Sequence, residues 1–170
     1  MAKSFSSDEA IYAGKVLGIW PIGFTGKSYN YILESKRFWI TFGNTVFITV
    51  VGTALNLAFT VFVSYAVSRK DMFGSKAIMI AYIFTMIFNA GMIPTYLAVS
   101  QIGLIDSLAS LIVPNIVTAY NVILMRNYID SLPEELIEAA DIDGANQMQI
   151  LFRIILPLML PSLATIGLFC

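Results

Sequence analysis

The chain has 170 residues, of which 58% are hydrophobic and 12% charged, and its mean hydropathy is +0.78. This composition excludes an ordinary soluble globular domain and is typical of a polytopic membrane protein. The net charge of −1 gives no reason to expect a nucleic-acid partner. The lack of histidine, the single Cys170 and the absence of a P-loop remove disulfides, thiolate metal clusters and most common catalytic sites. We therefore expect an all-α membrane protein without catalytic or metal-binding residues.

The first predicted element is a polar segment outside the membrane, residues 1–37. It is aromatic and rich in turn-forming residues, and it lacks the basic start, apolar middle and cleavage site of a signal peptide. Residues 38–68 follow without a charge. About 20 apolar residues cross a bilayer, so this stretch predicts a complete transmembrane helix.

Small polar residues recur every three or four positions along this first span, as a polar stripe on one helix face. Such a stripe indicates either close packing between helices or a wall of a translocation path, and the sequence leaves both open. The stripe consists of Thr45, Thr49, Thr53, Asn56, Thr60, Ser64 and Ser68.

Two further spans are predicted at 77–100 and 107–125, and a fourth apolar segment at 154–170. Pro94 lacks a backbone donor and should bend the second span, either as a substrate-facing break or as a packing kink. Pro94 and several neutral polar and aromatic residues of the second and third spans are candidates for a substrate path. They are Asn89, Pro94, Tyr96, Asn115, Tyr120 and Asn121.

Residues 126–153, between the third and fourth spans, have their own helical pattern. Ser131 and Glu134 match a capping box, which predicts a short helix from there to Asp143. Gly144 should stop this helix, because glycine adopts left-handed angles without steric cost. A second short helix is expected over 145–152. Acidic residues of the first helix should share one face, and they are Glu134, Glu138 and Asp141.

A longer motif runs through this stretch. It reads Glu138-Ala139-Ala140, two residues, Asp143-Gly144-Ala145, eight residues, Ile154, one residue, Leu156-Pro157. The motif resembles the EAA loop of the membrane subunits of bacterial binding-protein-dependent ABC importers, a MetI-like family of inner-membrane components. We call residues 126–153 the EAA loop. The stretches FNAGMIPTYL and GLIDSLASLIVP resemble the carbohydrate-uptake, maltose-permease-like branch of that family.

The resemblance implies a six-helix permease with its EAA loop between the fourth and fifth helices. The four predicted spans would then be helices two to five of an incomplete chain. It also implies an external position for residues 1–37 and a bacterial inner-membrane location. The implied partners are cytoplasmic ABC ATPase subunits, a second permease subunit and an extracytoplasmic solute-binding protein. ATP and Mg²⁺ would bind the ATPase, leaving this chain without a cofactor. The residues implied to couple the loop to the ATPase are Glu138, Ala139, Ala140, Asp143, Gly144, Ala145, Ile154, Leu156 and Pro157.

The expected function is ATP-driven import of a sugar or oligosaccharide, and the sequence leaves alternatives. One is the same architecture for a non-sugar solute. An anionic solute would often be met by a basic residue at membrane depth, and the first three spans contain none. Another is a truncated, non-functional fragment. A membrane-embedded enzyme would need convergent ionisable residues within the spans, and these are absent.

Overall fold

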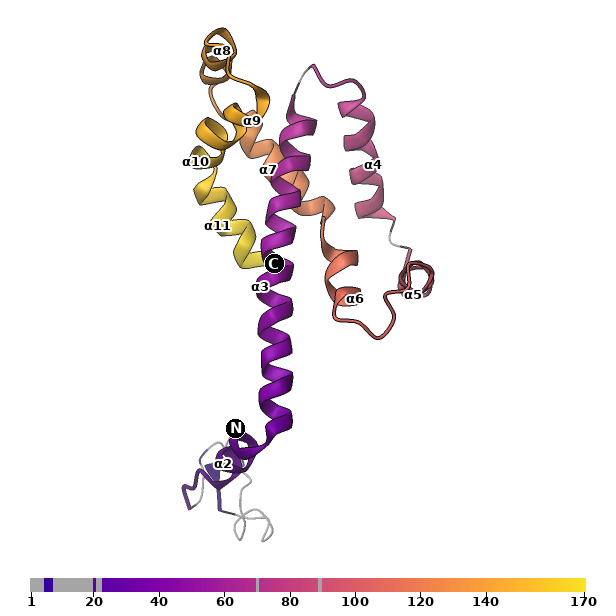
Figure 1. Cartoon of the computed structure of the whole chain (residues 1–170), viewed down its shortest axis with the longest axis vertical. Coiled ribbons are helices and arrows are strands. Elements are labelled where there is room, and N and C mark those ends of the chain that lie inside the picture. Colours follow the sequence, from indigo (N-terminus) through magenta and orange to yellow (C-terminus); the bar gives the residue numbers. More distant parts are fainter. Residues whose placement is uncertain (1–4, 8–19, 21–22, 70, 89) are drawn as a thin grey trace. The chain divides into compact units, whose positions relative to one another are not determined.

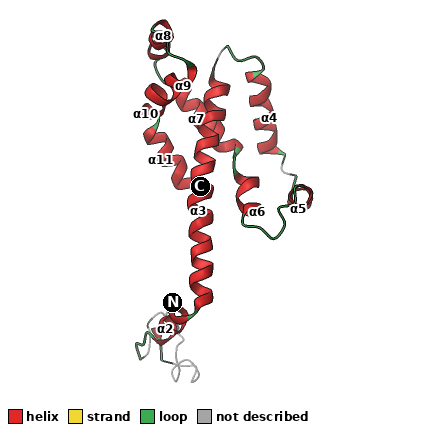
Figure 2. Ribbon diagram, in the orientation of Figure 1, coloured by secondary structure: helices red, strands yellow, loops and turns green. Residues whose placement is uncertain are grey.

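The computed structural model describes residues 5–7, 20, 23–69, 71–88 and 90–170, and the regular structure in these ranges is helical throughout (Figure 2). The predicted all-α class is therefore confirmed. The chain divides into two compact units, Met1–Val46 and Phe47–Cys170. About half of the predicted external segment, residues 1–37, lies outside the described residues, namely 1–4, 8–19 and 21–22.

In the first unit, a short helix leads directly into a long one. α2 (Lys27–Glu34) ends at Ser35, which is extended, and α3 (Lys36–Ser68) begins at the next residue. The junction is fixed by the indole Nε1 of Trp39, which donates to the carbonyl oxygen of Leu33 at 2.8 Å. This bond sets the direction in which α2 leaves α3.

α3 is a continuous helix of 33 residues. At 1.5 Å per residue it is about 50 Å long, whereas the hydrocarbon core of a bilayer is about 30 Å thick. It covers the predicted first span and begins two residues earlier, at Lys36. Its buried side chains all lie between Asn56 and Val67. The C-terminal half of α3 is therefore the part that packs within the second unit.

The predicted second span, 77–100, is two helices instead of one. α4 (Ser75–Ile87) ends at Phe88, and α5 (Met92–Gln101) starts after Gly91, whose φ is +84°. In Figure 1, α4 is seen from the side and α5 along its axis. The bend was expected at Pro94, but the chain turns before it. Pro94 occupies the first turn of α5, where an amide would have no intrahelical partner in any case.

The predicted third span, 107–125, is also interrupted. α6 (Ala109–Ile112) continues into a 3₁₀ turn, η2 (Val113–Asn115), and α7 (Ala119–Asp130) follows at an angle of 45°. Pro114 lies within the turn and cannot donate to a helical hydrogen bond. α7 runs five residues beyond the predicted end, so the first residues of the EAA loop belong to it.

The fourth predicted segment begins earlier than expected. Helix runs without interruption through α9 (Gln147–Ile150), the π-helical η3 (Leu151–Ile155) and α10 (Leu156–Leu158), and then bends by 75° into α11 (Leu160–Phe169). The second short helix, expected over 145–152, begins at Gln147 and continues directly into the fourth segment. Pro157 cannot donate to the carbonyl of Arg153, which is consistent with the wider π turn, and Pro161 follows the bend.

By length and composition, α3 is the one single helix among the described residues that could cross a membrane. Counting each of the two bent pairs as one span, α6–η2 with α7 and α9–α10 with α11, gives up to three. α4 is apolar but has only 13 residues.

The core of the second unit lies where α3, α7 and the C-terminal helices meet (Figure 1). α4 and α11 both pack against α7. The EAA loop contributes to this core, so it is attached to the helices and is not a free surface loop. The buried core residues are Val61, Tyr65, Met125, Ile129, Ala140, Ile150, Leu151, Ile155, Met159 and Ile166.

Candidate functional site

The first helix of the EAA loop, α8 (Glu134–Ile142), is fixed by its two ends. Two glutamates occupy its first turn, where negative charge suits the positive end of the helix dipole. At the other end Gly144 has φ +77°. The amides of Gly144 and Ala145 donate to carbonyl oxygens of the last turn at 3.1 and 3.0 Å, the pattern of a Schellman motif. The prediction that Gly144 ends the helix is confirmed.

The predicted capping box at Ser131 is wrong. Ser131 Oγ donates backwards to the carbonyl oxygen of Tyr128 at 2.6 Å, and Ser131 is the C-cap of α7. A residue before proline is disfavoured in helical angles, so a helix cannot readily start at Leu132, before Pro133. The helix begins at Glu134, directly after the proline.

A capping box is present one helix later, at Asn146. The Asn146 side chain accepts from the amide of Gln149 at 2.8 Å, and the Gln149 side chain accepts from the amide of Asn146 at 2.8 Å. Sequence reasoning missed it, although asparagine followed three residues later by glutamine is its signature. Together with the Schellman motif, the box fixes the turn between α8 and α9.

The motif residues of the EAA loop divide into an anchored group and an outward group. Ala140 is 7% exposed and belongs to the core, and Ala145, Ile154 and Leu156 are half-buried against it. The exposed group consists of Glu138, Ala139, Asp143, Gly144 and Pro157. Only the exposed group is available to a partner protein, and its predicted coupling role stays a prediction.

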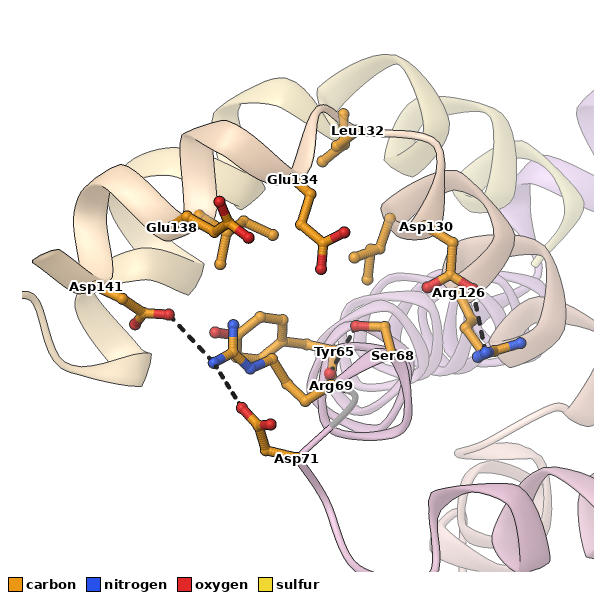
Figure 3. Close-up of a pocket in the computed structure, with 12 residues that line it drawn as sticks. Tyr65, Ser68, Arg69, Asp71, Arg126, Asp130, Leu132, Glu134, Glu138 and Asp141 are labelled. Carbon is orange, nitrogen blue, oxygen red and sulfur yellow. Dashed lines mark hydrogen bonds and ion pairs between the residues drawn. The ribbon is translucent and has the colours of Figure 1, made fainter.

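The acidic face of α8 lines an open cavity of about 510 Å³, which we call the charged cavity (Figure 3). Arg69, just after α3, lies between two carboxylates. Its Nη2 is 3.4 Å from Asp141 and 3.7 Å from Asp71. One member of the predicted acidic face, Asp141, is thus paired within this chain. The other charged or acidic lining residues are Arg126, Asp130, Glu134 and Glu138.

A second contact joins α3 to the EAA loop beside the charged cavity. Tyr65 Oη donates to Gln147 Oε1 at 2.6 Å, and Gln147 Nε2 donates to Asp141 Oδ1 at 3.4 Å. Tyr65 and Gln147 are 82 residues apart in sequence. No local pattern links such distant positions, so sequence reasoning did not find this contact.

The polar stripe of α3 packs against other helices over its buried part. Ser64 Oγ donates to the carbonyl oxygen of Val122 in α7 at 3.1 Å. Asn56 Nδ2 donates to the carbonyl oxygen of Asn115 at 2.8 Å, and Asn121 Nδ2 donates to Asn56 Oδ1 at 3.1 Å. For these residues the structure supports the packing interpretation, because buried amides and hydroxyls require such partners.

Nearer the N-terminus of α3, the stripe lines a second open cavity of about 480 Å³, which we call the amide cavity. Neutral polar groups of α3, η2 and α7 converge there. The structure thus brings three predicted substrate-path residues together with the stripe. The polar residues lining the cavity are Thr49, Thr53, Asn56, Asn115, Thr118, Tyr120 and Asn121.

Two other predicted substrate-path residues lie elsewhere. Pro94 and Tyr96 belong to α5, are exposed, and are not among the residues lining the amide cavity. Asn89 lies outside the described residues. The predicted set is therefore divided, and α5 contributes nothing to this cavity.

The two cavities offer different chemistry. The charged cavity can hold or exchange ion pairs, and the amide cavity can exchange hydrogen bonds with uncharged polar groups. In the described part of the chain, no cluster of three or more histidine, cysteine or acidic side chains is arranged to hold a metal ion.

Comparison with known proteins gives concordant results. Residues 37–169 match the family described as "Binding-protein-dependent transport system inner membrane component". The chain is 40% identical over 169 residues to the polygalacturonan/rhamnogalacturonan transport system permease protein YtcP of Bacillus subtilis, covering 99% of this chain and 59% of YtcP. It is 34% identical to the arabinooligosaccharides transport system permease protein AraQ of Halalkalibacterium halodurans, over 95% of this chain and 59% of AraQ.

A solved structure shows the same fold. It is the crystal structure of a bacterial ABC transporter involved in the import of the acidic polysaccharide alginate, and one of its chains matches with a TM-score of 0.92 and 40% identity. The match covers 99% of this chain and 60% of that chain. This chain thus spans about three-fifths of the length of the relatives it matches.

Proposed function

This chain belongs to the family of binding-protein-dependent transport system inner membrane components, and from that premise we propose that the complete protein is a permease subunit of an ATP-driven oligosaccharide importer. The observation that carries the proposal is the EAA loop. It presents small and acidic motif residues outward while Ala140 anchors it in the core shared with α3 and α7. A loop attached in this way can transmit a push to the membrane helices.

The outward surface of the EAA loop has the features of a protein-binding surface. Ala139 and Gly144 permit close backbone approach, and Glu138 and Asp143 supply negative charge. Large apolar side chains of α8 and α9 are also exposed, namely Leu136, Ile142 and Met148. Exposed apolar side chains that gather at a surface mark interaction sites. We assign this surface to a cytoplasmic ATPase subunit, which would bind ATP and Mg²⁺ and move the loop as it closes.

The amide cavity supports the substrate class. Its polar side chains, set among apolar ones, are mainly amides, hydroxyls and a phenol, which donate to and accept from sugar hydroxyl groups without requiring a charge. YtcP and AraQ are transport permeases for polygalacturonan or rhamnogalacturonan and for arabinooligosaccharides. We therefore assign an oligosaccharide to the complete transporter, with a second permease subunit and an extracytoplasmic solute-binding protein as further partners.

The test is site-directed cross-linking within the assembled transporter. A single cysteine replaces Ala139 in a full-length background from which every native cysteine, including Cys170, has been removed. Ala139 is preferable to Ala140, because Ala140 is buried. The control cysteine replaces Tyr96, which is exposed on α5, away from the loop. We expect the Ala139 variant to cross-link to the ATPase subunit and the Tyr96 variant not to.

Transport is measured on the same preparation. Proteoliposomes that contain both permeases and the ATPase, supplied with the binding protein, should accumulate a labelled oligosaccharide only when ATP is present. Absence of the Ala139 cross-link together with absence of ATP-dependent uptake would overturn the proposal.

A further inference from the structure

We infer that Tyr65, Arg69 and Gln147 are positioning residues that clamp the EAA loop to the end of α3, so that loop and helix move as one body. This inference rests on the proposed function, because it concerns how movement of the loop reaches the membrane helices. None of the three belongs to the EAA motif itself. We call these residues, with their shared partner Asp141, the clamp.

The clamp joins three parts of the chain through one carboxylate. Asp141 Oδ2 pairs with Arg69 Nη2 at 3.4 Å, and Asp141 Oδ1 accepts from Gln147 Nε2 at 3.4 Å. Gln147 Oε1 accepts from Tyr65 Oη at 2.6 Å. Tyr65 lies in the last turn of α3, and Arg69 directly follows the last residue of that helix. The contacts therefore form a circuit that starts in α3 and ends at the residue after it.

The clamp holds the loop at both of its helices. Asp141 lies near the end of α8 and Gln147 at the start of α9, on either side of the turn fixed by Gly144. Tyr65 is 7% exposed and its ring belongs to the core, so its hydroxyl is presented from a fixed position. Hydrogen bonds are directional, and these resist sliding and rotation of the loop against α3.

A nearby apolar contact cannot supply the same constraint. The rings of Phe62 in α3 and Phe152 in η3 meet edge to face, with centroids 6.1 Å apart. Such contacts hold surfaces together but tolerate a change of register more readily than a hydrogen bond does. The clamp therefore adds a directional constraint to the apolar packing between the loop and α3.

α3 connects the clamp to the amide cavity. Asn56, which bonds to Asn115 and Asn121, lies nine residues before Tyr65 on the same continuous helix. At 1.5 Å per residue this separation is about 14 Å. A displacement applied to the loop would therefore shift the amides that line the cavity, without passing through the loop's own connections to α7 and α10.

The experiment compares matched pairs of variants in the complete transporter. Tyr65→Phe removes only the clamp hydroxyl, and Tyr82→Phe makes the same change in α4, away from the loop. Asp141→Asn removes the negative charge that pairs with Arg69 in the clamp. Asp71→Asn removes the negative charge of the other carboxylate near Arg69, which is highly exposed. Uptake, ATP hydrolysis and co-purification of the ATPase are measured for each in proteoliposomes.

We expect Tyr65→Phe and Asp141→Asn to retain the ATPase and its hydrolysis while uptake falls about threefold to tenfold, the factor expected for one lost hydrogen bond. The ATP hydrolysed per oligosaccharide imported should rise by the same factor. Tyr82→Phe and Asp71→Asn should resemble wild type. The single variants Arg69→Asp and Asp141→Arg should each lose uptake, and the double variant, which exchanges the two charges, should recover part of it. A general folding defect would not be relieved by the second substitution.

A second measurement makes the clamp testable without transport. Spin labels at Phe59 and Ala139, in the same background free of native cysteines, report the distance between α3 and the loop. We expect a narrow distance distribution in the otherwise wild-type protein and a broader one with Tyr65→Phe. An unchanged distribution, or wild-type coupling in Tyr65→Phe, would overturn the clamp. Absence of ATP-driven uptake in wild type itself would instead overturn the proposed function.

Discussion

The amide cavity and the charged cavity share α3 as a wall but are held together differently. Around the amide cavity, Asn56 and Asn121 are buried and bond to each other, and Asn56 also donates to the backbone carbonyl of Asn115. Around the charged cavity, Arg69 and Asp141 remain partly exposed, with 21% and 40% of their side-chain surface accessible. The same helix is thus fixed by neutral hydrogen bonds at one level and by solvated ion pairs at the other.

This difference separates contacts that stabilise the fold from contacts that couple the loop to α3 and can be exchanged. A buried amide that loses its partner keeps its full desolvation penalty. An exposed ion pair contributes little, because water and salt replace it. Neutral contacts are also favoured at membrane depth, where a charged side chain has a high free energy. We expect substitutions in the amide cavity to destabilise the fold and substitutions in the charged cavity to alter coupling first.

The largest expected effect is from Asn56→Leu. This change removes the amide that Asn115, Thr60 and Asn121 all contact and leaves buried polar groups unpaired. We expect a loss of about 2–3 kcal/mol in the free energy of unfolding, measured by denaturant unfolding of the purified protein in detergent. Thr45→Val is the control, because Thr45 is exposed and its hydroxyl bonds only within α3. A loss as small as that of the control would contradict the assignment.

Gly144→Val should have the next largest effect, and it concerns the loop. Gly144 has φ +77° with no atom within 4 Å of an added Cβ, so the cost is backbone strain and not a clash. A β-branched residue there should cost about 1–2 kcal/mol. We expect membrane insertion to persist while uptake is lost. Gly144→Asn is the matched control, since asparagine adopts left-handed angles more readily, and it should retain most uptake. Equal uptake by both variants would contradict backbone strain at residue 144 as the cause of the loss.

Much of the helical framework was predictable because its signals are local. Residues 38–68 contain no charge, which alone predicts the long helix α3. Gly144 ends α8 because no other residue type adopts its angles as cheaply. The motif of the EAA loop was likewise readable from spacing. Its division into buried Ala140 and exposed Ala139 was not, because adjacent alanines look alike until the core is known.

The errors come from competition between local signals and from tertiary contacts. Pro94 was expected to break a helix, yet proline is tolerated in a first turn and the turn occurs at Gly91 instead. Ser131 matched a capping box, but Pro133 prevents its use. The bond between Tyr65 and Gln147 depends on how two distant segments fold together.

A smaller effect is expected from Asn146→Ala, which removes the capping box of α9. Loss of an N-cap side chain costs about 1 kcal/mol, and here it also frees the turn that carries Gln147 of the clamp. We expect faster amide hydrogen exchange over 146–150 and a modest fall in uptake. Asn127→Ala, on exposed α7 surface, is the control. Unchanged exchange would show that the Schellman motif alone fixes the turn.

The smallest effect on stability should come from Asp130→Asn, which breaks the pair between Arg126 and Asp130 on α7. The atoms are 3.2 Å apart and both side chains are about one-third exposed, so the pair should contribute about 0.3–0.5 kcal/mol, and about 0.5 M salt should abolish the difference. Arg126 Nε, however, is buried and has no hydrogen-bond partner among the described residues. If that atom makes the pair behave as a buried one, the loss in unfolding free energy will exceed about 1 kcal/mol and persist in salt. Such a result would end the contrast between the two cavities, because charge would then stabilise the fold as the amides do.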